Sequence, residues 1–166
     1  MTAHRVWRFG DNIDTDVLAP GIYMKKPIAE IAAHCLEAVE PRFAKEVRPG
    51  DVVVGGRGFG MGSSREQAVE ALLHLGVVAV LALSFGGIFY RNALNYGLLA
   101  LASPDIGRIR QDDRVVVDGV AGTVIDETTG ERLTCEKLPA HLLAMIADGG
   151  LVPHLEKRFG RRGVKA

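Results

Sequence analysis

The segment from residue 51 to residue 83 constrains the fold more than any other part of the sequence. Asp51-Val52-Val53-Val54 is typical of a buried strand, and a glycine-rich run over 55–62 follows it directly. A helical spacing then places apolar side chains on one face: Ala68, Ala71, Leu72 and Leu75. A second β-rich run covers 77–83. This order predicts a parallel β-loop-α-β unit with a right-handed crossover.

The flanking segments extend this unit into a single α/β domain. Before it we expect a strand over 6–9, a turn-rich acidic loop over 10–16 and a helix over 27–39. After it we expect a helix over 85–96 and a strand over 98–101. Beyond Pro104 the pattern becomes antiparallel, with a strand over 115–117, a hairpin of 122–125 and 132–135, and a last helix over about 139–147. The prediction is one domain over 1–166, with its core over about 5–155 and an added antiparallel β layer.

Length and charge exclude several classes of protein. A chain of 166 residues is long enough for one domain with a substantial core. Lys plus Arg equal Asp plus Glu at 20 each, which argues against a nucleic-acid or anionic-membrane partner. The basic run at 156–166 is expected to be a frayed, solvated tail. The longest uncharged stretch, 75–90, is too short to span a membrane, and no secretory signal opens the chain. We therefore expect a soluble, cytoplasmic protein.

The two cysteines, Cys35 and Cys135, lie far apart in the sequence and form no C-x-x-C motif. We expect both to be buried, Cys35 on a helix face and Cys135 in a strand. Iron–sulfur clusters normally need about four thiolates, or three with one open iron. This chain alone is therefore expected to hold no cluster.

The most informative chemistry lies in the run from Gly58 to Gln67. It lacks the G-x-G-x-x-G dinucleotide fingerprint, the P-loop and the G-x-S-x-G elbow. A predicted helix start instead favours an anion, and glycines let the backbone approach it. Arg65 opposes the helix dipole there, but its guanidinium is suited to a carboxylate ligand. A serine at this position could be held partly as an alkoxide. The alternative is that Ser63 with Glu66, or Ser64 with Gln67, forms a capping box.

Two other segments are candidates for substrate contact. In the loop Tyr23-Met24-Lys25-Lys26, Lys25 could pair with an acid and Met24 could supply an adaptable apolar contact. The alternative is an ordinary solvated lysine pair at a turn. Asp14, Thr15 and Asp16 could bind a metal or orient partner groups, although such residues usually make local turns. The five histidines have no ligand-like spacing, so we assign them no role.

Four motifs, in this order, resemble the small subunit of 3-isopropylmalate dehydratase, which is similar to the swivelling domain of aconitase. They are 11–16 (Asp-Asn-Ile-Asp-Thr-Asp), the loop at Tyr23, 60–67 (Gly-Met-Gly-Ser-Ser-Arg-Glu-Gln) and 84–92 (Ser-Phe-Gly-Gly-Ile-Phe-Tyr-Arg-Asn). The resemblance covers about residues 5–155. It implies a three-layer β/β/α swivelling domain that closes over a large subunit carrying a 4Fe-4S cluster, as a heterodimer or heterotetramer.

The resemblance also implies a reaction and residue roles. The reaction is reversible dehydration of a 2-hydroxy di- or tricarboxylate, which for isopropylmalate belongs to leucine biosynthesis. Ser63 matches the serine that removes the carbon-bound proton as an alkoxide. Ser64 and Arg65 match residues that hold the substrate and its carboxylate, and Asp16 matches an active-site aspartate. The open iron of the partner would act as Lewis acid on the leaving hydroxyl.

Three segments depart from the family pattern. The loop reads Tyr23-Met24-Lys25-Lys26 where relatives often have Tyr-Leu-Arg-Thr, and a lysine lacks the planar fork of arginine. Leu83 and Gly87 stand where relatives often have Lys and Arg, and Met61 stands where they often have Cys. The alternatives are therefore a homoaconitase or a methylmalate or dimethylmalate dehydratase small subunit. A different class is a free-standing organic-acid-binding module.

Overall fold

A seven-stranded mixed sheet organises the fold. The computed structural model describes residues 1–163. The strands are β1 (His4–Arg8), β2 (Val52–Val54), β3 (Ala79–Ala82), β4 (Leu99–Ala102), β5 (Arg114–Asp118), β6 (Thr123–Asp126) and β7 (Arg132–Thr134). Their order is β4-β3-β2-β1-β5-β6-β7, with β1 to β4 parallel and β5 to β7 antiparallel. Both the parallel unit and the added antiparallel layer are confirmed.

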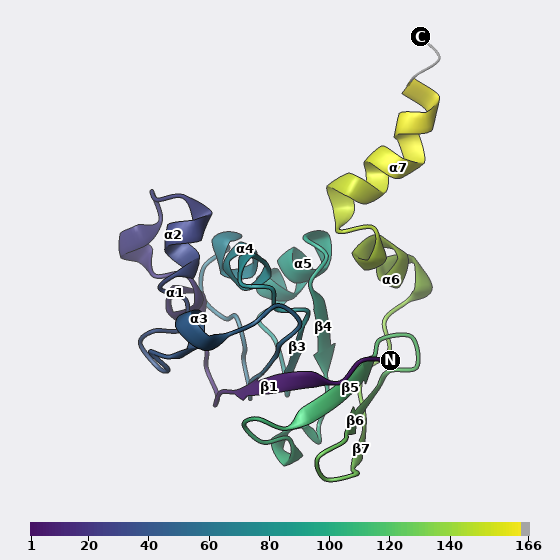
Figure 1. Cartoon of the computed structure of the whole chain (residues 1–166). Coiled ribbons are helices and arrows are strands. Elements are labelled where there is room, and N and C mark those ends of the chain that lie inside the picture. The colour runs from purple at the N-terminus through teal and green to yellow at the C-terminus, as the bar shows by residue number, and fades with distance from the viewer. Residues whose placement is uncertain (164–166) are drawn as a thin grey trace.

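Helices cover one side of the parallel strands, and the antiparallel strands lie on the other side (Figure 1). The helical elements are α1 (Thr15–Leu18), η1 (Gly21–Tyr23), α2 (Ile28–Ala32), α3 (Phe43–Glu46), α4 (Gln67–His74), α5 (Gly87–Asn95), η2 (Ile106–Arg108), α6 (Ala140–Ala147) and α7 (Leu151–Gly163). Within residues 1–163, no helix is both long and apolar enough to cross a bilayer.

Two hydrophobic cores lie on opposite faces of the parallel strands. Val53 and Val80 belong to the core beneath α4 and α5, together with Leu72 and Phe89. Their neighbours along the strands face the other way, because side chains alternate in a strand. The second core joins Val52, Val54 and Leu81 to the antiparallel residues Val115, Val124 and Leu133. A β layer, a second β layer and a helical layer therefore stack as the predicted β/β/α arrangement.

The predicted helix over 27–39 is wrong in extent, because α2 ends at Ala32. Leu36 has a positive φ of 62°, and its amide donates to the Val17 carbonyl rather than to a helical partner. A left-handed residue breaks the helical hydrogen-bond ladder, so 33–39 forms successive turns. The same departure corrects Cys35, which lies in these turns and not on a helix.

The predicted burial of both cysteines is confirmed, but they lie in different cores. Cys35 is fully buried in the core beneath the helices, and burial raises the pKa of its thiol. Cys135 lies directly after β7 in the second core, and burial raises its thiol pKa as well. The thiolate is the form that ligates a metal, so neither side chain is prepared to do so.

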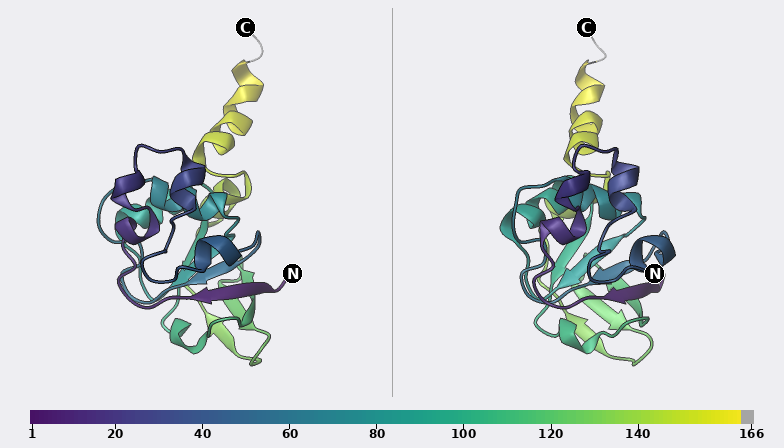
Figure 2. Two further views of the ribbon diagram at one scale, coloured as in Figure 1. Left: turned by 60° about the vertical axis from the view of Figure 1, so that its left-hand side comes forward. Right: turned by 90° about the vertical axis from the view of Figure 1, so that its left-hand side faces the viewer.

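The C-terminal segment is helical rather than frayed as predicted. Helix α7 continues through Gly163 and extends away from the rest of the chain (Figures 1 and 2). Most of its described side chains are exposed, as expected for the basic run. Lys165, the last basic residue of that run, lies outside the described residues.

A pair of buried carboxyl groups lies where β5 meets β6. Asp113 is 5% exposed and Asp126 is 1% exposed. Asp126 Oδ1 accepts hydrogen bonds from the amides of Thr128 (2.9 Å) and Thr129 (3.4 Å). Its Oδ2 has no hydrogen-bond partner among the described residues. Burial first, and then the neighbouring Asp113, raise the pKa of Asp126.

Candidate active site

The loop between β2 and α4 lies at the carboxyl end of the parallel strands and is shaped by glycines. Gly58, Gly60 and Gly62 have φ values of +68°, +78° and +112°, a region that favours glycine. A Cβ on Gly60 would overlap the Phe89 ring of α5. The loop is therefore held close to α5, while its tip is turned outward. Met61, Ser63 and Ser64 at this tip are all exposed.

Ser63 is held by a residue from a distant segment. Its amide donates to Thr15 Oγ1 at 3.1 Å, and the hydroxyl oxygens of the two residues are also 3.1 Å apart. Thr15 is the first residue of α1 and is buried, with 3% exposure. Its own amide donates to the Met61 carbonyl at 2.9 Å. The serine loop and the start of α1 are thus joined by three polar contacts.

The capping alternative for the serines is wrong. Helix α4 begins at Gln67, and its N-cap residue is Glu66, at which no side-chain cap hydrogen bond forms. Ser63 contacts Thr15, and Ser64 uses its carbonyl to accept from Asn92 Nδ2 at 3.4 Å. Both serines precede the helix and lie in the loop. Their hydroxyl groups are therefore not engaged at the start of α4.

Arg65 is oriented from α1. Its Nη1 donates to Asp16 Oδ1 and to the Ala19 carbonyl, each at 2.9 Å. The Gly21 amide donates to the same Asp16 oxygen at 2.8 Å. Hydrogen bonds from Arg65 and then from Gly21 lower the pKa of Asp16. The structure therefore joins Asp16 of α1 to Arg65 of the serine loop, two residues that the family resemblance assigns to one site, and leaves Arg65 Nη2 and Nε without a partner among the described residues.

Helix α5 supports the loop from the other side. Asn92 reaches the Ser64 carbonyl, and the Tyr96 hydroxyl donates to Glu66 Oε2 at 2.6 Å. That hydrogen bond raises the pKa of Tyr96, because the phenol must keep its proton to donate. The residues on either side of Arg65 are thus hydrogen-bonded to Asn92 of α5 and to Tyr96 directly after it, so the end of the loop that leads into α4 is fixed.

The structure does not bring Met24 and Lys25 into direct contact with this group. They follow η1 on a loop that begins at Gly21, next to Arg65. Met24 is half-buried and packs against the helix-side core. Lys25 is exposed and has no hydrogen bond or ion pair within the described chain. Their role in substrate selection stays a prediction.

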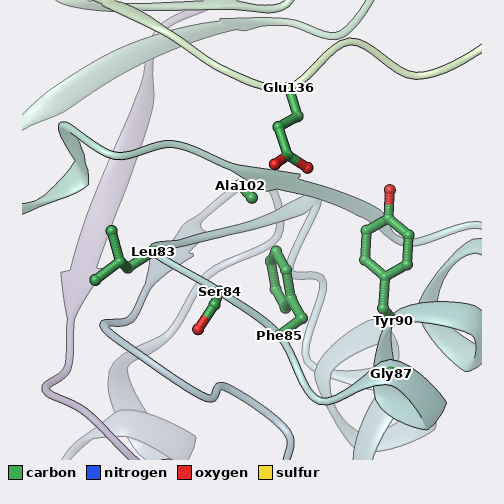
Figure 3. Close-up of a pocket in the computed structure, with 7 residues that line it drawn as sticks. All are labelled: Leu83, Ser84, Phe85, Gly87, Tyr90, Ala102 and Glu136. Carbon is green, nitrogen blue, oxygen red and sulfur yellow. The ribbon is translucent and has the colours of Figure 1, made fainter.

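Leu83 and Gly87, two of the departures from the family pattern, line one cavity. It has a volume of about 240 Å³ and lies at the ends of β3 and β4. Glu136 reaches it from the segment after β7, and Tyr90 reaches it from α5 (Figure 3). Without the two basic side chains of the family pattern, the charged residue lining this cavity is an acid. These two departures thus fall in one local environment, which neither Ser63 nor Ser64 lines.

No set of metal ligands accompanies these residues. Within residues 1–163, no three His, Cys, Asp or Glu side chains gather as a metal site would require. Asp14, considered a metal candidate from the sequence, instead caps α1, where its Oδ1 accepts from the Val17 amide at 2.8 Å. Sequence reasoning placed Thr15 in a local turn and missed its contact with Ser63. No local signal could have found that contact, because the partners lie 48 positions apart.

Comparison with known proteins finds relatives of the aconitase family that match nearly the whole chain. A model of the aconitase C-terminal domain matches residues 35–105. The homoaconitase small subunit of Methanothermobacter thermautotrophicus is 46% identical over 92% of this chain and 89% of its own length. The 3-isopropylmalate dehydratase small subunit of Syntrophus aciditrophicus is 43% identical over 93% of this chain and 95% of its own.

The isopropylmalate/citramalate isomerase small subunit of Methanocaldococcus jannaschii is 42% identical over 93% of this chain and 94% of its own. A crystal structure of a 3-isopropylmalate dehydratase from the same organism superposes with a TM-score of 0.92, at 38% identity and 99% coverage of both chains. These likenesses extend from the sequence motifs to the arrangement of the strands. The chain therefore belongs to the family of small subunits of 3-isopropylmalate dehydratases and homoaconitases, which share the aconitase C-terminal fold.

Proposed function

We propose that this chain is the small subunit of a hydro-lyase that isomerises 2-isopropylmalate and 3-isopropylmalate by dehydration and rehydration. The observation that carries the proposal is that two adjacent residues of α1 hold the exposed serine and the arginine: Thr15 contacts the Ser63 hydroxyl and Asp16 pairs with the Arg65 guanidinium. A base and a carboxylate-binding cation are the two groups that proton removal next to a carboxylate needs.

In this proposal Ser63 moves the proton. Its Oγ, as the alkoxide, takes a proton from the carbon adjacent to a substrate carboxylate, and the electron pair of that C–H bond forms the double bond as the C–O bond on the neighbouring carbon breaks. The leaving hydroxide would be accepted by a Lewis acid that the large subunit supplies. Rehydration in the opposite sense returns the proton from the same oxygen. A serine performs this role only when its alkoxide is stabilised by fixed donors. Ser63 is exposed at a loop tip, so a substrate can reach it.

Arg65 and Ser64 hold the substrate carboxylate. Arg65 uses Nη1 for Asp16 and the Ala19 carbonyl, and its Nη2 and Nε remain to form a bidentate pair. Asp16 carries a negative charge and would repel a substrate carboxylate. We therefore assign Asp16 to orienting Arg65, rather than to binding the substrate directly.

The site needs a large subunit to be complete. Ser63 is exposed and Arg65 is partly exposed, whereas such chemistry requires a site shielded from water. A 4Fe-4S cluster does not fit this chain, because its two cysteines are buried in separate cores and no metal-ligand group forms among residues 1–163. The proposal therefore places the cluster on the partner, in a heterodimer or heterotetramer that works in the cytoplasm.

The alternative substrates are homoaconitate and methyl-substituted malates. Relatives of nearly equal identity carry homoaconitase and isopropylmalate/citramalate isomerase names, so identity does not separate them. Within the proposal, selection among these acids depends on the loop of Met24 and Lys25, which begins beside Arg65.

The test is to produce the full chain with its large subunit and assay the pair anaerobically. The substrates are 2-isopropylmalate, homocitrate, citramalate and dimethylmalate, and dehydration is followed by the ultraviolet absorbance of the new conjugated double bond. We expect the highest kcat/KM for isopropylmalate. Failure of the assembled pair on every acid would refute the proposal, and binding of the acids by the isolated chain would then support a binding module.

A loop exchange tests substrate selection separately. Replacing 24–26 (Met-Lys-Lys) by Leu-Arg-Thr is expected to change the ratio of kcat/KM values among the four acids. Lys45→Arg serves as a control, because it makes the same lysine-to-arginine change as at position 25, but on α3, outside the loop. An unchanged ratio in the loop variant would mean that this loop does not select the substrate.

A further inference from the structure

The side chain of Thr15 is placed to act on Ser63. Thr15 Oγ1 lies 3.1 Å from both the amide nitrogen and the hydroxyl oxygen of Ser63. The threonine is buried at 3% exposure, whereas the serine is exposed. An ordered donor behind an exposed serine is thus fixed by the fold before any substrate arrives.

The donors and acceptors available at Thr15 Oγ1 determine which hydroxyl group donates in its contact with Ser63. A threonine hydroxyl has one proton to donate and two lone pairs to accept with. The Ser63 amide can only donate, so it occupies one lone pair of Thr15 Oγ1. The Thr15 proton then needs an acceptor, and Ser63 Oγ is the acceptor that the structure offers within the described residues. The reverse direction would leave a buried proton unpaired, which is costly.

We propose that Thr15 is a positioning residue that donates a hydrogen bond to Ser63 Oγ and stabilises that oxygen when it has lost its proton. The inference rests on the proposed role of Ser63 as base. A donor aimed at this oxygen stabilises the alkoxide relative to the hydroxyl, so that more of the serine is in the form that can remove a carbon-bound proton. Thr15 does not touch the substrate and acts through Ser63.

The surroundings of Thr15 favour this close approach. Gly62 has a φ of +112°, and a Cβ at this position would lie 3.1 Å from Thr15 Oγ1. A side chain there would crowd the hydroxyl, so glycine keeps the space open. Three successive residues thus make separate contacts: Asp14 caps α1, Thr15 contacts Ser63 and Asp16 pairs with Arg65.

The experiment compares Thr15→Val with Thr15→Ser in the full chain assembled with its large subunit. Valine has nearly the same shape but no hydroxyl, whereas serine keeps the hydroxyl. A hydrogen bond to a charged group supports an expected fall in kcat of about 10- to 100-fold for Thr15→Val. We expect KM to stay within about twofold, and the kinetic isotope effect with substrate deuterated at the reacting carbon to rise, because proton removal becomes slower. Thr15→Ser should restore most of kcat.

Ser63→Ala separates this inference from the proposed function. If Ser63→Ala keeps full activity, the proposed base is wrong, whatever Thr15 does. If Ser63→Ala is inactive but Thr15→Val keeps the wild-type kcat and isotope effect, the Thr15 inference alone is overturned. Should valine prevent assembly, Thr15→Ala removes the hydroxyl without adding atoms. An equal kcat for Thr15→Ala and Thr15→Ser would also overturn the inference.

Discussion

Asp126→Asn is expected to stabilise the protein, although it changes a buried side chain. The wild-type carboxyl has one oxygen that accepts from two amides and one, Oδ2, without a hydrogen-bond partner among the described residues. In the variant the amide oxygen keeps the first role, and the NH₂ group takes the position of Oδ2 beside Asp113. The unpaired acceptor Oδ2 is thus replaced by an NH₂ donor next to the Asp113 carboxylate. The free-energy cost of a buried acceptor without a donor disappears.

The size of the effect depends on pH. The pKa of Asp126 in the folded protein lies above the ordinary value of 3.8, so the fold retains a proton that the unfolded chain has released. Stability from this proton is complete below the ordinary value and is lost as pH rises through the folded-state pKa. A buried unsatisfied polar group costs about 1–3 kcal/mol. The variant should therefore gain about that much free energy of unfolding at pH 8, and little at pH 4.

Urea unfolding followed by circular dichroism at several pH values between 4 and 8 measures this difference. Asp112→Asn is the matched control, because Asp112 is an exposed carboxylate next to Asp113 and its loss should change stability by less than about 0.5 kcal/mol. A variant that is less stable than the wild type at pH 8 would refute the reasoning. A gain that is equal at every pH would show that the ionisation of Asp126 is not its cause.

Three further predictions concern the site and its support. Arg65→Lys loses the planar fork and its bond to Asp16, so KM of the assembled enzyme should rise about 10- to 100-fold in steady-state assays. Gly60→Ala meets Phe89 and a φ of +78°, and should lower the free energy of unfolding by about 2–5 kcal/mol, with Gly10→Ala, which meets nothing, as control. Burial would raise the pKa of Asp51, but hydrogen bonds from Arg5, the Arg48 amide and Trp7 lower it overall. Stability from Asp51 is thus present above the ordinary value of 3.8 and lost as pH falls through the folded-state pKa, so Asp51→Asn should flatten acid unfolding followed by Trp7 fluorescence.

The parts of the fold governed by local periodicity were predictable from the sequence. The strands around Val53 and Val80 and the helix through Leu72 follow from alternation and helical spacing, which act over a few residues. The end of α2 was not predictable, because Leu36 leaves the helix to bond Val17, a partner 19 positions away. Apolar spacing continues past that break and gives no sign of it.

In the candidate site, too, adjacent residues could be predicted from the sequence and long-range contacts could not. Ser63 and Arg65 could be named because the glycines, serines and arginine are adjacent in the sequence. Their contacts with α1 could not be predicted, because Thr15 and Asp16 reach them across the fold and look like ordinary turn residues on their own. Only the family resemblance assigns Asp16 to this site. The sequence also indicated that Arg65 binds an external carboxylate, whereas an internal carboxylate, Asp16, already contacts one of its three guanidinium nitrogens, Nη1.

The short helix α1 does not tolerate an insertion within residues 14–16. Asp14, Thr15 and Asp16 each perform a separate task, and successive helical residues are rotated by about 100° around the axis. One residue inserted between Thr15 and Asp16 would turn the carboxylate away from Arg65, even though every original side chain would still be present. An insertion in the loop after η1 would leave the orientation of Asp16 toward Arg65 unchanged. Among related chains, an unchanged spacing of the residues equivalent to 14–16 should therefore indicate an active site better than chain length or overall sequence identity does.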